Sequence, residues 1–130
     1  MSAADEASAL LDELLGPLRT HFLGAGAAYR AYLDHGRSFL LANSLRRINL
    51  AARTLLVARG HLLPVELQAC ATALIGHYDV WLRLWGEQAQ RLQPAPGDAF
   101  AFENEVTYPR EAEQRLMRLY EDLRRDARSV

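Results

Sequence analysis

Apolar residues recur every three or four positions through most of this chain, which is the spacing of amphipathic α-helices. The first stripe consists of Ala7, Leu11, Leu14, Leu18 and Phe22, and it continues as Ala25, Tyr29 and Tyr32. Ser2, with Asp5 three residues later, is typical of a helix start, and Gly36 suits a left-handed helix stop. Proline lacks a backbone donor and clashes with the preceding turn, so we expect a kink or a break at Gly16-Pro17.

Three further helices are predicted downstream. We expect them over residues 38–59, from about Pro64 to 92, and from Pro109 to about 128, because each stretch has its own apolar stripe. The loop over residues 93–108 contains Phe100 and Phe102, whose alternation lets both side chains pin the loop to the helices. The pattern therefore predicts one all-α domain over residues 1–130. Its expected architecture is an antiparallel up-and-down bundle of four helices, or of five if Gly16-Pro17 divides the first.

Composition narrows the class of protein. The chain has 130 residues and a formal net charge of −1, which disfavours a nucleic-acid binder driven by bulk charge. Cys70 is alone in an apolar stretch, and we interpret it as a buried thiol. There is no disulfide framework, no basic leader and no apolar run of membrane-spanning length. We therefore expect a cytoplasmic protein with no membrane partner.

The second predicted helix is the candidate functional element, because its charges are segregated. Residues 37–60 contain five arginines, including Arg46, Arg47 and Arg53, and no acidic residue. At about 100° per residue, these three arginines share one arc with Asn43 and Asn49. The opposite arc is the expected core side, and it holds Leu41, Leu45, Ile48, Ala52, Leu55 and Leu56.

Three large apolar residues, Phe39, Leu50 and Val57, fall within the polar arc. A solvated helix face does not usually carry such a group. Three explanations compete: the acidic loop with Asp98, Glu103 and Glu105 covers the face, a partner chain packs on it, or it binds a polyanion such as nucleic acid. Arginine mixed with large apolar groups is typical of protein interfaces. We therefore predict an interface made by Phe39, Arg46, Arg47, Leu50, Arg53 and Val57.

A short motif gives an enzymatic alternative. The segment Arg30-Ala-Tyr-Leu-Asp-His35 resembles the R-x(4–6)-H motif of HEPN ribonucleases, which are small helical bundles that usually dimerise. The resemblance covers six residues, and Ala31 stands where that family often has a polar residue. It implies a metal-independent ribonuclease in which Arg30 and His35 form the catalytic pair, with His35 acting as general base.

Other chemistry has little support in the sequence. The four histidines are widely spaced and form no H-x-x-x-H or E-x-x-H pair, although residues such as His35, His61 and His77 can still converge in a folded chain. We expect no cofactor and no metal, and we favour a non-enzymatic protein. The main prediction is a non-catalytic interaction or regulatory module that forms a homodimer or binds a protein partner through the arginine and apolar face. The alternatives are the ribonuclease and a small-ligand or metal binder in the bundle interior.

Overall fold

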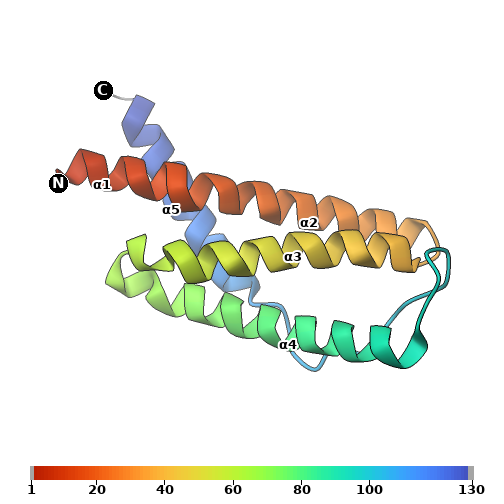
Figure 1. The fold of residues 1–130 in the computed structure, drawn as a ribbon. Helices are drawn as coiled ribbons and strands as arrows, with labels where there is room; N and C mark the ends of the chain where they lie inside the picture. The colour runs from red at the N-terminus through yellow and green to blue at the C-terminus, as the bar shows by residue number, and fades with distance from the viewer. Residues whose placement is uncertain (1, 129–130) are drawn as a thin grey trace.

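The computed structural model describes residues 2–128. Their regular secondary structure is helical, and it forms four helical rods packed against one another (Figure 1). The first rod joins α1 (Ala3–Leu10), a π-helical segment η1 (Leu11–Leu15) and α2 (Gly16–Asp34). It starts as predicted: the Ser2 hydroxyl accepts a hydrogen bond from the Asp5 backbone N–H at 3.1 Å, and the Asp5 carboxylate accepts one from the Ser2 backbone N–H. The helical elements confirm the predicted all-α class.

The predicted kink or break at Gly16-Pro17 does not divide the first rod. The wider π-helical turn brings the Gly16 N–H to the Leu11 carbonyl, and the turn accommodates Pro17, which has no N–H to donate. Glycine is required here, since a Cβ at position 16 would lie 2.9 Å from the Leu11 carbonyl oxygen. A π-bulge thus replaces the break.

The remaining helices are α3 (Phe39–Arg59), α4 (Gln68–Leu92) and α5 (Arg110–Arg128), and two short 3₁₀ segments, η2 (Gly60–Leu62) and η3 (Val65–Leu67), connect α3 to α4. The chain turns back after α2 and again after α3, so that α3 lies between α2 and α4, whereas α5 crosses behind the first rod at a steep angle (Figure 1). The first turn uses two residues in the left-handed region, Gly36 and Arg37, with φ of 72° and 52°. Gly36 therefore ends the first rod as predicted.

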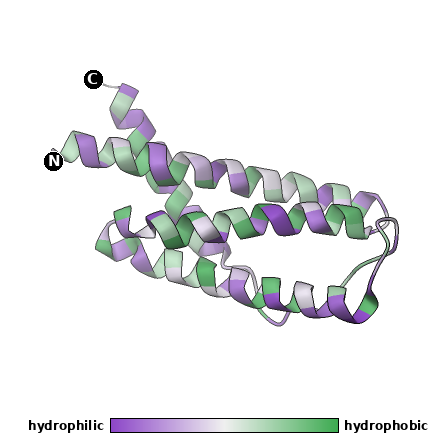
Figure 2. Ribbon diagram, in the orientation of Figure 1, coloured by the Kyte–Doolittle hydropathy of each residue, from purple (hydrophilic) through white to green (hydrophobic). Residues whose placement is uncertain are grey.

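Each helix shows hydrophobic and hydrophilic positions side by side along its length, as expected for amphipathic helices (Figure 2). The main core lies where η1 and the helices α2 to α5 meet, and its fully buried side chains are Leu14, Leu15, Leu18, Leu56, Leu74 and Leu116. Cys70 is buried in this core, as predicted. Among residues 2–128, no helix is both long and apolar enough to cross a membrane.

A second, aromatic cluster fixes the loop between α4 and α5. Phe100 is fully buried, with ring centroids 5.1 Å from Trp85 and 5.2 Å from Phe39, and Phe102 lies 6.1 Å from Phe100. The loop backbone also bonds the α2–α3 turn: the Phe39 N–H donates to the Asp98 carbonyl and the Phe100 N–H to the Arg37 carbonyl, both at 2.8 Å. The predicted role of Phe100 and Phe102 as pins is confirmed.

Candidate functional site

The predicted interface residues of α3 do not all lie on an open face. Phe39 was expected there, and the structure corrects this, because its ring stacks on Trp85 inside the aromatic cluster. Arg46 lies over the Trp85 ring of this cluster, with its guanidinium carbon 5.1 Å from the ring centroid. Arg53 forms an ion pair with Asp79 of α4. These three side chains therefore have contacts within their own chain.

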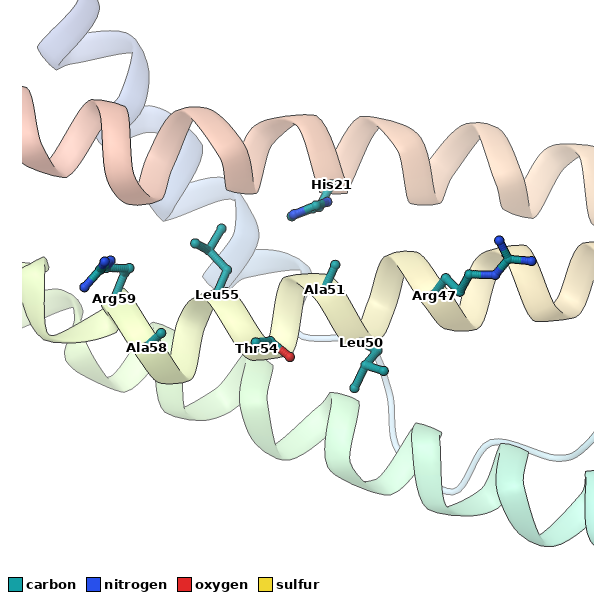
Figure 3. A pocket seen from close by; sticks show the side chains of 8 residues that line it. All are labelled: His21, Arg47, Leu50, Ala51, Thr54, Leu55, Ala58 and Arg59. Carbon is teal, nitrogen blue, oxygen red and sulfur yellow. The ribbon is translucent and has the colours of Figure 1, made fainter.

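The rest of the predicted face is open to solvent. Leu50 is 37% exposed, Val57 is 57% exposed, and Arg47 is also exposed. The acidic loop does not cover them, since the Glu105 carboxylate pairs with Arg83 of α4 at 3.6 Å and the Asp98 carboxylate accepts the Ala95 N–H. A shallow groove of about 640 Å³ follows this side of α3 (Figure 3). We call it the α3 groove; it is lined by His21, Arg47, Leu50, Ala51, Thr54, Leu55, Ala58 and Arg59.

Asn49 is the clearest departure from the sequence prediction. We assigned it to the arginine arc, yet it is buried, with 8% of its surface exposed. The buried stripe of α3 is Ala42, Asn49, Ala52 and Leu56. Ala52 and Leu56 were predicted to face the core, but Ala42 and Asn49 were not. The stripe extends to these two because α2 and α4 cover both flanks of α3. The spacing of seven from Ala42 and from Leu56 was the available signal, since residues two helical turns apart share a face.

Asn49 lines an interior cavity of about 530 Å³, a size typical of small-molecule sites. The cavity lies between α2, α3 and α4, and the end of the loop and the start of α5 cover part of it. It opens to solvent beside Tyr29, Asn104 and Arg110, which are exposed. Small residues of α2, Ala25 and Gly26, form part of its wall and cannot fill the space. We call it the interior cavity.

Asn49 and His77 are the two polar side chains that are buried among residues 2–128, and both line the interior cavity. The Asn49 amide forms no hydrogen bond with the described part of the chain, but its atoms are not fully enclosed, and 8% of the residue surface is exposed. The His77 Nδ1 is enclosed and likewise unpartnered there. Buried polar groups in native proteins are nearly always hydrogen-bonded, and leaving one unsatisfied costs about 1–3 kcal/mol. The cavity therefore holds polar groups that a bound molecule can satisfy.

Two tyrosines and a carboxylate form the neighbouring wall. The Tyr108 hydroxyl donates to the Glu113 carboxylate at 2.5 Å, and the Tyr108 ring meets the His77 ring edge-to-face at a centroid distance of 5.0 Å. Burial raises the pKa of Tyr78 to about 12, and it also raises the pKa of Tyr108. Burial lowers the pKa of His77. At neutral pH these three side chains are therefore uncharged.

The residues of the alternative predictions are not brought together. Arg30 and His35 are both exposed, and helical spacing places them about 140° apart around the axis of the first rod. No hydrogen bond joins them within residues 2–128. His35 follows α2, His61 lies in η2 and His77 lies in α4, and no group of three or more His, Cys, Asp or Glu side chains in the described chain is arranged to hold a metal ion. The geometry assembles neither the Arg30–His35 pair nor a metal site within the described residues.

Comparison with protein-family models, with curated proteins and with solved structures finds no match to this chain.

Proposed function

We propose that this protein is a non-catalytic binding module that takes up a small organic molecule in the interior cavity. The observation that carries the proposal is the pair Asn49 and His77: they are the buried polar residues of the described chain, they line one cavity, and they lack partners. Sequences do not retain such groups for stability, because an apolar residue in their place costs less. A bound ligand would supply the hydrogen-bond partners that Asn49 and His77 lack.

Water is the competing occupant, since a polar cavity of this size does not stay dry. Several of the walls, however, are aromatic or aliphatic, including Phe22, Leu45 and Trp81. Ligand sites combine such walls with a few polar groups that fix orientation. Water in contact with the apolar part is easily displaced, and its release favours binding.

The test is ligand titration followed by ¹H–¹⁵N NMR of the full chain, with cyclohexanol, toluene and benzamide as probes at millimolar concentration. The indole N–H of Trp81 reports on the cavity, and that of Trp85 reports on the aromatic cluster outside it. We expect at least one probe to shift the Trp81 resonance and to leave the Trp85 resonance nearly unchanged. If no probe shifts Trp81, the cavity holds only water and the proposal is wrong.

Self-association through the α3 groove is a second proposal. It is supported by the exposure of Leu50 in the groove and of Val57, which lies on the same helix but does not line the groove. Two small residues of the groove, Ala51 and Ala58, allow a second helix to approach closely. Arg47 lies at one end, and at the other Arg59 pairs with Glu13 at 3.5 Å. An antiparallel pairing of two α3 helices brings Arg47 of each copy toward this carboxylate, so a second copy of the chain is the proposed occupant.

Sedimentation velocity of the wild type and of a Leu50→Ser, Val57→Ser double variant tests this second proposal. We expect a dimer for the wild type and a monomer for the variant. Leu23→Ser is the matched control, because Leu23 is also exposed but lies on α2 and does not line the groove. A monomeric wild type at the highest soluble concentration contradicts self-association. We also expect the protein to act in the cytoplasm, because its one cysteine is a free thiol.

A further inference from the structure

The aromatic content of the interior cavity narrows the shape of its ligand. Five aromatic side chains line it, from α2, α4 and the loop: Phe22, Tyr29, Tyr78, Trp81 and Tyr108. Rings pack on one another in offset-stacked or edge-to-face geometry and gain more than their buried area alone provides. A flat molecule uses such walls better than a bulky one, so the shape of the wall favours a planar ring.

The charge of the inner wall narrows the ligand further. Asn49 is neutral, and burial lowers the pKa of His77, so the deepest polar groups carry no charge. A charged group placed against them would lose its hydration without gaining a counter-charge, which costs several kcal/mol or more. Arg110 and Glu113 also line the cavity, but Arg110 is exposed to solvent rather than buried beside Asn49 and His77, and Glu113 is already bonded to Tyr108. The buried part of the ligand is therefore uncharged.

The hydrogen-bonding edge of the ligand follows from the free amide of Asn49. A primary amide presents an acceptor oxygen and a donor NH₂ side by side, and it pairs best with a molecule that presents a donor next to an acceptor. Asparagine makes this bidentate contact with adenine in nucleic-acid recognition. The neighbouring imidazole of His77 supplies one further donor or acceptor, according to its tautomer.

We infer that the proposed ligand is an uncharged planar ring with adjacent hydrogen-bond donor and acceptor atoms, of the nucleobase, lactam or aromatic carboxamide class. Its ring packs on the aromatic walls and its polar edge pairs with Asn49. This inference rests on the proposed function, and it specifies the chemistry of the same cavity.

The test compares four probes of similar size: benzamide, benzoate, benzylamine and toluene. We expect benzamide to bind with a dissociation constant about tenfold lower than those of the other three, measured from the Trp81 indole resonance. The advantage over toluene should disappear in Asn49→Leu, which has no amide, and shrink in Asn49→Ser. Asn43→Leu, on the same helix but outside the cavity, should keep the full preference.

The outcomes separate the ligand class from the existence of the site. If toluene, benzoate or benzylamine binds as well as benzamide, the inferred class is wrong while the binding site remains. The same conclusion holds if cyclohexanol binds and none of the four does. If Asn49→Leu keeps the preference for benzamide, the Asn49 amide does not hydrogen-bond the polar edge of the ligand, and that part of the inference is wrong. If no probe binds, both the inference and the proposed function fail.

Discussion

Replacing Asn49 with leucine should make the protein more stable, although asparagine is the native residue. Asn49→Leu removes a buried amide that has no partner within residues 2–128 and puts a side chain of similar size in its place. If the amide is kept for a ligand, the ligand-free protein carries its desolvation cost without compensation. If the amide is structural, its removal breaks contacts and lowers stability. The sign of the change in unfolding free energy therefore distinguishes the two roles.

The expected gain has two parts. Relief of one unsatisfied buried polar group is worth about 1–3 kcal/mol, and the better helix propensity of leucine adds about 0.5 kcal/mol or less. Asn43→Leu on the same helix is the matched control, since it gains the propensity but relieves no buried group. For a domain of this size, 1 kcal/mol corresponds to about 4 °C in Tm.

Urea unfolding followed by circular dichroism measures the difference between the two variants. We expect Asn49→Leu to exceed Asn43→Leu by about 1–2 kcal/mol. A variant that is less stable than the wild type, or that gains no more than the control, would refute the reasoning. The amide would then have a partner, such as an ordered water, whose bonds fully offset its burial.

Three further predictions test the fold and its chemistry. Gly16→Ala should lower the free energy of unfolding, measured with urea, by more than about 1 kcal/mol, because its Cβ would meet the Leu11 carbonyl oxygen at 2.9 Å. The control Gly86→Ala, which has open space around its Cβ, should raise this free energy by about 0.5–1 kcal/mol. Equal effects of the two substitutions would mean that the π-helical turn relaxes freely. Phe100→Ala should lower the free energy of unfolding by about 3–5 kcal/mol, because the Phe100 ring is fully buried. It should also speed hydrogen exchange at the Phe39 amide, which donates to the Asp98 carbonyl of the loop. An unchanged exchange rate would show that the loop is held without this ring. Burial lowers the pKa of His77 from 6.5, and the groups facing the ring are Tyr78, Tyr108 and, beyond them, Glu113. The unfolded chain then binds the proton more readily, so the stability that neutral His77 provides is present above pH 6.5 and is lost as the pH falls below it. His77→Phe should flatten this part of the pH profile of urea midpoints, and a profile identical to that of the wild type would contradict the assignment.

Local pattern was enough to predict most of the helices and their ends. Ser2 and Ser38 cap the two helices that were predicted to begin at these residues. Gly36 takes the left-handed conformation that stops the first rod. The same local rules failed at Pro17. A missing donor at proline predicts a break, but packing of the buried Leu14 and Leu15 holds the rod together and a π-helical turn absorbs the mismatch. Which of these responses occurs depends on what covers the helix.

The composition and spacing of residues determined that this chain folds into helices with apolar faces. They did not determine which arc of α3 is buried, because that depends on the two helices that flank it, and an arc of arginines is compatible with more than one orientation. Tertiary packing turned Asn49 inward, matched Arg53 with Asp79 and stacked Phe39 on Trp85. Tertiary packing also formed the interior cavity, since its walls come from segments that are distant in sequence and no periodicity within one segment encodes their meeting.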